Sequence, residues 1–328
     1  MKILFIGGTG NISTDCATLL HERGHEIIVV TRGNARVPSE YRSITADRKN
    51  LDTMRRALDG VMADVVVNFL GFELSDIETD YTLFAGKVRQ YIFISTAMVY
   101  AKPHRQIPIT ENAPLGNPYS DYAKNKLACE RWIMEKPNLP ATIVRPSHTY
   151  SRRWIPNVVS SAGYWFAARL EQGKPVFVPN DGENPWTLTA TTDFAVGLAG
   201  LVGNEKAIGE TFHITSNEAL SWNRIYAEIA TALGAAAPVI EKIPVDFICK
   251  NFPDLTGAVK GDKAEPGVFD SSKIKRFVPD FVCRKPFSVG IRESVAWLRA
   301  HPEDQQPNPK ADALVDQIIA VWRKEEPK

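Results

Sequence analysis

The sequence predicts an α/β protein built on a doubly wound parallel sheet and followed by a smaller mixed α/β region. Short apolar runs alternate with segments of helical periodicity over residues 1–150, the pattern of a parallel sheet covered by helices on both faces. A glycine-rich turn, GGTGNIS, directly follows the first apolar run. Glycine at that point lets the backbone turn sharply from a strand into a helix.

The expected strands are apolar at successive positions, as in strands that are buried on both faces. They are predicted at 3–6, 26–30, 43–46, 64–70, 91–95 and 141–145. The helices between them carry apolar residues three or four positions apart. They are predicted at 12–23, 51–58 and 119–135.

Beyond residue 147 the pattern becomes irregular. Three prolines break the 174–186 stretch into loops and short strands, and tryptophans are scattered among short segments. Helices are predicted at 191–201, 221–233, 288–298 and 311–322, the last one amphipathic. We therefore expect a first region at 1–150, a smaller second region at 151–305 whose chain can cross back around 186–215, and a linker with a terminal helix at 306–328.

Bulk composition excludes several classes of protein. The 328 residues have a net charge of +1, so no global field attracts nucleic acid or an anionic membrane. No apolar run approaches the length of about 18 residues that a membrane helix needs. The four cysteines contain no CxxC pair and are expected to be free thiols of a reducing cytoplasm. No metal is expected, because the histidines His21, His25, His104, His213 and His301 have no metal-ligand spacing.

The glycine turn has the spacing Gly7-x-x-Gly10-x-x-Ser13. Glycine allows backbone N–H groups to approach a pyrophosphate closely, and the helix that follows points its positive end at the phosphate. A turn of this kind after the first strand predicts a Rossmann domain that binds a nicotinamide dinucleotide. The contacts are expected from Gly7, Thr9, Gly10, Asn11 and Ile12. The alternative is a plain glycine turn.

The end of the second strand bears on which dinucleotide is bound. NAD sites usually place Asp or Glu there, on the ribose hydroxyls. This chain has Thr31-Arg32-Gly33 instead, and a guanidinium can hold a 2′-phosphate. NADP is therefore favoured and NAD is the alternative, unless Arg32 is only a solvated loop residue. Asp47 follows the third strand, where it can accept a hydrogen bond from adenine or cap the next helix.

Tyr122 and Lys126 lie four residues apart, on one face of a predicted helix. A phenol is a weak acid at neutral pH, and a nearby cation, helped by the charge of the cofactor, is expected to lower its pKa. The phenol can then exchange a proton with a carbinol or a carbonyl while hydride moves. The alternative is a surface aromatic beside a solvated lysine. Ser95 and Thr96 end the fifth strand, and either hydroxyl could bind the reacting oxygen.

These segments together resemble the extended short-chain dehydrogenase/reductase superfamily, the NAD-dependent epimerase/dehydratase family. The matching segments are FIGGTGNIS, FISTAMVY, ITENAPLGNPYSDYAKNKLACE and IVRPSHTY. The resemblance implies an NAD(P)-binding region at 1–150 and a substrate-binding region at 151–305. It implies that Thr96 is the catalytic hydroxyl, Tyr122 the acid–base and Lys126 its partner. Leu70 and Pro146, which end strands, are placed at the cofactor.

Two departures from the family pattern bear on the reaction. Ala97-Met98 stand where dehydratases of the family tend to carry Asp-Glu, which makes dehydration doubtful. Trp186 stands where epimerases tend to carry an arginine on the pyrophosphate, which suggests a flatter or less charged substrate, unless Trp186 is a core residue. The candidate substrate contacts are Ala97, His148, Trp154, Asn157 and Trp186, although a lone histidine is more often structural.

The expected function is hydride transfer at a carbinol or carbonyl carbon of a sugar-like or other small substrate, by an NAD(P)-dependent oxidoreductase or epimerase. The rival is a Rossmann protein that binds RNA, or senses NADP(H), without turnover. The short 70–91 stretch and the Arg-Gly after the second strand resemble the atypical branch that includes chloroplast stem-loop-binding proteins. Catalysis ranks first because Thr96, Tyr122 and Lys126 are all present. A nucleic-acid partner is not expected, and the chain is a monomer or a homodimer.

Overall fold

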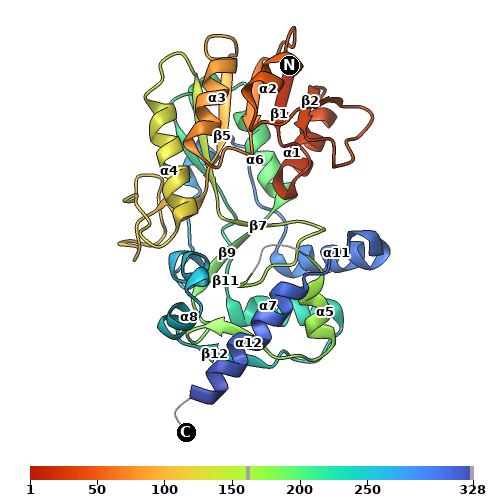
Figure 1. Ribbon diagram of the computed structural model, residues 1–328, viewed down its shortest axis with the longest axis vertical. Helices are drawn as coiled ribbons and strands as arrows, with labels where there is room; N and C mark the ends of the chain where they lie inside the picture. The colour runs from red at the N-terminus through yellow and green to blue at the C-terminus, as the bar shows by residue number, and fades with distance from the viewer. Residues whose placement is uncertain (160–162, 326–328) are drawn as a thin grey trace.

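The computed structural model describes residues 1–159 and 163–325 (Figure 1). Within these residues, seven parallel strands form one sheet in the order β10-β6-β5-β4-β1-β2-β3. The strands are β1 (Lys2–Ile6), β2 (Glu26–Thr31), β3 (Arg42–Thr45), β4 (Val65–Asn68), β5 (Gln90–Ile94), β6 (Ala141–Pro146) and β10 (Thr211–Ile214). Strand order reverses between β1 and β4, and ligands of such sheets bind at the carboxyl edge beside that point. The predicted doubly wound parallel sheet is confirmed.

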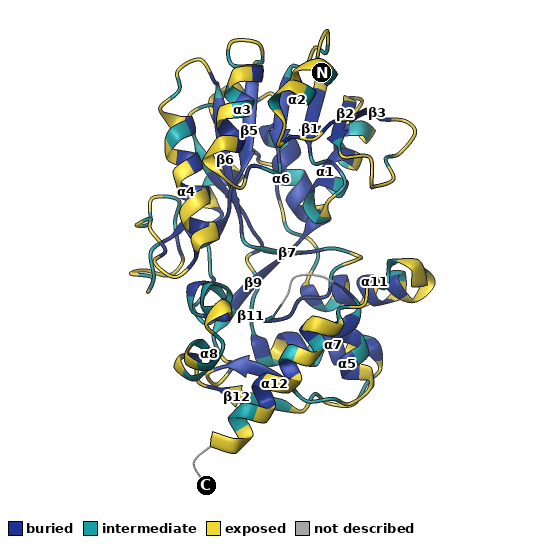
Figure 2. Cartoon of the chain, viewed as in Figure 1, coloured by how far each residue is buried: buried dark blue, intermediate teal, exposed yellow. Residues whose placement is uncertain are grey.

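Helices cover both faces of this sheet because alternate strand residues point to opposite sides. Ile3 and Phe5 pack toward α1 (Asn11–Glu22) and α6 (Thr191–Leu201). Leu4 and Ile6 pack toward the other side. The helices of that side are α2 (Leu51–Ala57), α3 (Leu74–Phe84) and α4 (Asp121–Met134). Figure 2 shows the strands as buried and the outer surfaces of the helices as exposed.

Helix α3 was not predicted from the sequence. Its inward face carries the buried acids Asp76 and Asp80 beside the buried apolar residues Ile77 and Leu83. Two acids on that face interrupt the apolar stripe by which an amphipathic helix is recognised in a sequence. The stripe is incomplete because both acids accept hydrogen bonds from partners inside the protein, Asp80 from Arg48 and Asp76 from the Phe72 amide.

The second region has its own strands and its own core. In the described part of the chain, β7 (His148–Tyr150), β9 (Pro185–Ala190) and β11 (Ala219–Ser221) form one small sheet, and β8 (Val176–Pro179) pairs with β12 (Ile240–Ile243). The helices here are α5 (Trp165–Glu171), α7 (Trp222–Leu233), α8 (Val245–Asn251), α9 (Thr256–Ala258), α11 (Phe287–Ala300) and α12 (Pro309–Glu325). They enclose a core rich in aromatic side chains.

The chain passes repeatedly between the two regions (Figure 1). Strand β9 leads directly into α6, which packs against α1, and β10 then pairs with β6. Helix α10 (Ser272–Phe277) also returns to this side, where Ile274 is buried in the same core as Phe5. Residues 151–305 therefore contribute to both cores. None of the described helices combines the length and apolar character needed to span a membrane.

Candidate active site

A cavity of about 740 Å³ lies at the carboxyl edge of the large sheet, between the two regions. Its walls come from the β1–α1 turn, from the ends of β2, β4, β5 and β6, and from residues 186–187 and 262–269. Sites for small molecules are usually clefts of roughly 300–1,000 Å³, mostly apolar, with a few convergent polar groups. The cavity has the size and the position expected of a ligand site.

The β1–α1 turn at the cavity wall packs closely against the loop between β4 and α3. Gly7 has φ +86°, and a Cβ atom on it would lie 2.5 Å from Cγ of Leu70. The Ser13 hydroxyl accepts a hydrogen bond from the Gly10 amide at 2.8 Å, and Ser13 is buried. Serine at the third position of the motif therefore fixes the turn. The first turn of α1 contains no acidic residue, so the positive end of the helix faces the cavity without a neutralising charge.

Several polar groups on the cavity wall lack partners. Asn11 Oδ1, Ser95 Oγ and Trp186 Nε1 are buried and have no hydrogen-bond partner among the described residues. Buried polar groups normally find one, so these atoms are suited to a ligand. Together with the glycine turn, they fit a nicotinamide dinucleotide. The predicted contact residues Gly7, Thr9, Gly10, Asn11, Ile12, Leu70 and Pro146 all line the cavity.

Arg32 stands at the far end of this wall, just after β2. Its side chain is exposed, lines the cavity, and makes no hydrogen bond or ion pair with another described residue. The neighbouring Thr31 hydroxyl accepts from the Gly33 amide at 3.1 Å and fixes the turn. The end of β2 thus offers the cavity a guanidinium and no carboxylate.

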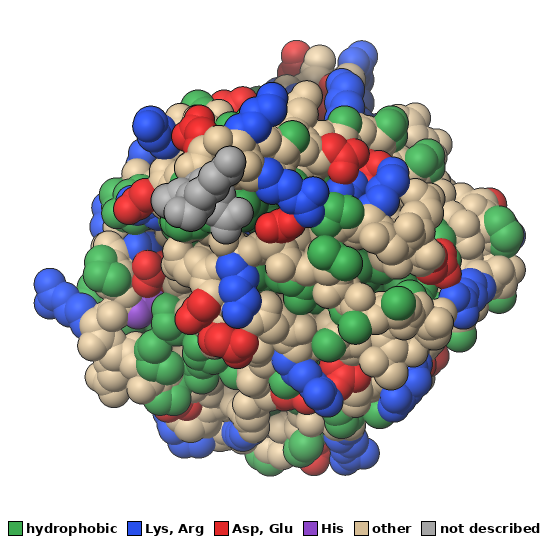
Figure 3. Space-filling view, turned by 90° about the horizontal axis from the view of Figure 1, so that it is seen from below, with side chains coloured by type: hydrophobic (Ala, Val, Ile, Leu, Met, Phe, Trp, Pro, Cys, Tyr) green, Lys and Arg blue, Asp and Glu red, His purple; other side chains and the backbone are tan. Residues whose placement is uncertain are grey.

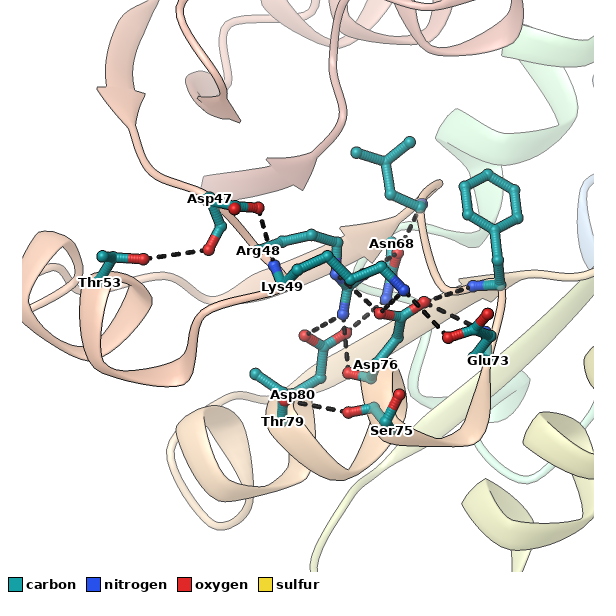
Figure 4. Close-up of polar contacts among 12 residues, drawn as sticks. Asp47, Arg48, Lys49, Thr53, Asn68, Glu73, Ser75, Asp76, Thr79 and Asp80 are labelled. Atoms are coloured by element: carbon teal, nitrogen blue, oxygen red, sulfur yellow. Dashed lines mark hydrogen bonds and ion pairs between the residues drawn. The ribbon is translucent and has the colours of Figure 1, made fainter.

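Asp47 is not among the described residues that line the cavity. It is exposed, and its carboxylate accepts from the Lys49 amide at 3.0 Å. It does not cap α2 with its side chain either, because Asn50 Oδ1 accepts from the Thr53 amide at 3.0 Å as the N-cap. Figure 4 shows Asp47 bonded only locally. The N-cap Asn50 lies three positions after Asp47, for which capping was one of two expected roles.

A buried polar network supports the β4–α3 loop, which carries Leu70 and Phe72 to the cavity (Figure 4). Arg48 donates to Asp80 at 3.0 Å and to the Asp76 carbonyl at 2.7 Å. Asn68 bonds Asp80 and accepts from the Leu70 amide at 2.7 Å. Burial raises the pKa of Asp80, and Arg48 opposes the rise. The network thus fixes the loop through the backbone amide of Leu70.

The Asp76 carboxylate completes this support. It accepts from the Phe72 amide at 2.9 Å and from the Glu73 amide at 3.1 Å. It also pairs with Lys49 at 2.9 Å. The two inward acids of α3 are therefore the groups that fix the loop.

Lys126 lies under the aromatic side chains of this loop and of β5. Its ammonium donates to the Ile94 carbonyl at 2.7 Å and lies 5.0 Å from the Phe72 ring and 4.7 Å from the Phe93 ring. It is 1% exposed, and burial lowers its pKa to about 8. Helix α4 is held in register by the buried Glu130–Arg145 pair, at 2.6 Å. The lysine is a fixed, desolvated group at the cavity wall.

Tyr122 faces the same cavity one turn earlier, with its ring centroid 5.9 Å from the Lys126 ammonium. Burial raises its pKa to about 12, and the hydroxyl of Thr96 partly offsets the rise. The expected lowering by Lys126 is therefore wrong for the protein alone. The reason is that the lysine lies over the ring, itself desolvated, and does not bond the phenol oxygen.

Both hydroxyl residues at the end of β5 line the cavity. Thr96 Oγ1 accepts from the Met98 amide at 3.2 Å and caps the short helix Ala97–Val99. The same hydroxyl lies against Tyr122 and partly offsets the rise in the pKa of that phenol. Ser95 Oγ is the unpartnered one. The geometry therefore places Thr96 beside Tyr122 and leaves Ser95 as a second polar contact.

Four of the predicted substrate contacts, Ala97, His148, Trp154 and Trp186, line the cavity. His148 is neutral, because burial lowers its pKa to about 3. Trp186 is both a wall residue and a core residue, since it is 5% exposed and packs on Trp222. Asn157 is fully buried and does not line the cavity; its amide bonds the backbone of Ile155.

Other wall residues were missed by sequence reasoning. They include Phe72, Met98, Lys102, Asp262, Lys263 and Phe269. Most of them lie in loops or in the π-helical turn Val259–Lys263, where no periodic pattern marks a residue. A π-helical turn is a frequent feature of functional sites, but only the structure reveals it.

Comparison with known proteins agrees with this geometry. The profile of the NAD dependent epimerase/dehydratase family matches residues 3–215. The 2'-dehydrokanamycin reductase of Streptomyces kanamyceticus is 25% identical over 304 residues, which cover 91% of this chain and 84% of the relative. The chloroplast stem-loop binding protein of 41 kDa b of Arabidopsis thaliana is 29% identical over 262 residues, covering 75% of this chain and 67% of the relative.

Solved structures share the fold. The UDP-glucose 4-epimerase of Thermus thermophilus, in complex with NAD, superposes with a TM-score of 0.72 at 20% identity, over 92% of this chain and all of that one. The dTDP-glucose 4,6-dehydratase of Bacillus anthracis, also with NAD, gives 0.72 at 19% identity, over 92% and 98%. Since the family profile spans more than half of its residues, this chain belongs to the NAD dependent epimerase/dehydratase family.

Proposed function

We propose that this protein is an NAD(P)-dependent oxidoreductase or epimerase that transfers hydride at a carbinol or carbonyl carbon of a sugar-like or other small substrate. One observation carries the proposal. Thr96, Tyr122 and Lys126 face the same cavity as the glycine turn. A proton-transfer group beside a dinucleotide site is the arrangement that carbonyl reduction and carbinol oxidation require.

The residues of the chain have distinct roles in this proposal. The Gly7–Ser13 turn would hold the pyrophosphate, and Lys126 the nicotinamide ribose. A bound nicotinamide dinucleotide supplies or accepts the hydride. Tyr122 gives a proton to the substrate oxygen or takes one from it, and the Thr96 hydroxyl orients that oxygen. The raised pKa of Tyr122 favours the protonated phenol, which is the form that donates to a carbonyl.

NADP is the proposed cofactor. Arg32 lines the cavity without a partner among the described residues, and no carboxylate ends β2. A 2′-phosphate would supply the missing anion, whereas an NAD ribose would find no acid to bind. The proposed oxidoreductase class also agrees with the name of the Streptomyces relative, a reductase. Ala97-Met98 offer no acid for the additional proton transfers of a dehydration.

The test compares two tyrosines. NADPH and NADH are titrated into the apoprotein, and NADPH oxidation is then followed with a panel of ketones and keto sugars. Tyr122→Phe is expected to lower kcat by about 10²–10⁴-fold and to leave the NADPH Kd unchanged. Tyr119→Phe is the matched control, because Tyr119 is similarly exposed and does not line the cavity. Wild-type turnover by Tyr122→Phe would falsify the mechanism.

RNA binding is the second candidate, favoured by the name of the Arabidopsis relative. Figure 3 shows lysine and arginine side chains interspersed with aspartate and glutamate on one face, without a single-sign patch there. Binding of neither dinucleotide, together with salt-dependent binding of a stem-loop RNA, would place this candidate first.

A further inference from the structure

The substrate end of the cavity carries two lysines from separate parts of the chain. Lys102 lies in the loop after the Ala97–Val99 helix, and Lys263 ends the π-helical turn. Asp262 is the one acidic side chain among the described residues of the wall. His148 on the same wall is neutral. The wall around the substrate is therefore aromatic, with an excess of positive charge.

Lys263 is held in place by its backbone. Its carbonyl accepts from Trp222 Nε1 at 3.0 Å and from Asn184 Nδ2 at 3.3 Å. Two residues earlier, the Gly261 carbonyl accepts from Asn117 Nδ2 at 2.7 Å. Asn117 also donates to the Met98 carbonyl, which ties the π-helical turn to the segment that carries Thr96. The lysine is thus positioned relative to the reacting groups.

The ammonium of Lys263 is poorly compensated in this position. The side chain is 8% exposed, and Nζ lies 3.4 Å from Asp262 Oδ2 and 3.5 Å from the Ala258 carbonyl. Both contacts are at the upper limit of hydrogen-bond length. A buried charge without short partners costs free energy, which an anionic ligand would recover.

Lys102 is in a similar state. Its ammonium contacts Nε2 of His104 at 2.6 Å, and burial lowers the pKa of that histidine to about 4. The ring is therefore a neutral partner, and Asp262 and Glu265 offset the burial of the ammonium only in part. Burial also lowers the pKa of Lys102, a cost that an anion beside it would reduce.

We infer that the substrate carries one anionic group, a carboxylate or a phosphate monoester, that is recognised by Lys263 with the help of Lys102. The inference rests on the proposed function and names its substrate class. The single anion agrees with Trp186 on the same wall, where a diphosphate would require more cationic donors. An amine-rich sugar would be repelled by the same lysines.

The test uses four small aromatic probes that differ in charge. Benzoate, phenyl phosphate, benzamide and benzamidine are titrated into the NADPH-saturated protein and followed by calorimetry. Benzoate or phenyl phosphate is expected to bind at least tenfold more tightly than benzamidine, with benzamide between them. The tighter of the two anions identifies the carboxylate or the phosphate as the preferred group.

The lysine is tested with a neighbour as the control. Lys263→Met is expected to weaken binding of the anions about tenfold and to leave benzamide unchanged. Lys260 lies on the same turn, pairs with Asp246 and does not line the cavity. The control Lys260→Met should therefore leave the binding of all four probes unchanged. Lys102→Met, in another segment, repeats the test if Lys263→Met melts early.

Binding of benzamidine as tight as, or tighter than, that of the two anions would overturn the inference. So would a failure of all four probes to saturate the protein, or unchanged anion binding in both Lys263→Met and Lys102→Met. NADPH binding is measured in the same samples. Failure to bind NADPH would count against the proposed function, and the probe series on the apoprotein would still decide the role of the lysines. NADPH binding without a charge preference would remove only the inference about the substrate.

Discussion

The two ends of the cavity are built in different ways. At the cofactor end, the wall comes from short contiguous segments, the Gly7–Ser13 turn and the ends of parallel strands. At the substrate end, Lys102, Trp186 and Lys263 come from segments far apart in the chain. The first end needs backbone groups at the edge of a sheet, and the second needs side chains suited to one ligand. In the proposed function, the fold therefore determines the cofactor end, and irregular segments determine specificity.

The largest expected effect tests whether the cofactor end depends on the buried network beneath it. Arg48→Met leaves Asp80 as an unpaired buried carboxylate, which should lower the free energy of unfolding by about 3–5 kcal/mol. The β4–α3 loop should loosen and NADPH should bind more weakly. Urea unfolding, followed by tryptophan fluorescence, measures the stability.

Lys49→Met is the control for that prediction. Lys49 is half exposed and pairs with Asp76 and Glu73, so its loss should cost about 0–1 kcal/mol. Equal effects of the two substitutions would show that the buried network does not support the loop.

The next prediction concerns the desolvated lysine of the cofactor end. Between pH 8 and 10.5, folded protein has released the Lys126 proton that the unfolded chain still holds, because burial lowers the pKa of Lys126 from 10.5 to about 8. The contribution of Lys126 to the free energy of unfolding therefore rises with pH across that window and is lost below pH 8. Relative to Lys126→Met, the wild type should gain up to about 3 kcal/mol from pH 7 to 10.5. A pH-independent difference in apoprotein melting would contradict this.

Arg32→Ala sharpens the comparison by separating the two dinucleotides. NADPH affinity should fall about 10–100-fold, the worth of a charge-assisted hydrogen bond, and NADH affinity should stay the same. Arg36→Ala is the matched control, since Arg36 is exposed and does not line the cavity. An equal loss for both dinucleotides would assign Arg32 a role unrelated to a 2′-phosphate.

The smallest effect distinguishes Asp47 from Asn50. Asn50→Ala removes the cap of α2 and should cost about 1 kcal/mol. Asp47→Ala, which removes only a local bond, should cost less than about 0.5 kcal/mol and leave NADPH binding unchanged. A weaker NADPH complex in Asp47→Ala would restore the residue to the cofactor site.

The sequence predicted the location of those residues whose position follows from spacing along the chain. Gly7 and Gly10 are three positions apart, and Tyr122 and Lys126 are four positions apart. The strands beside them are apolar runs, so the periodicity of the sequence predicts that these residues lie at one edge of the sheet. Lys263 has no such signal, because a π-helical turn and the contacts of Asn117 and Trp222 position it. The pKa of Tyr122 depends on partial burial and on Thr96 and Asp262 from other segments, which no local pattern contains.

The repeated passage of the chain between the two regions has a consequence for unfolding. Helix α6 and strand β10 complete the larger sheet, although a long part of the second region precedes them in the chain. A fragment ending at residue 150 would expose the apolar face that α6 covers, including Ile3 and Phe5. The two cores should therefore melt together in one calorimetric transition, and a proteolytic nick in either would release no autonomous domain.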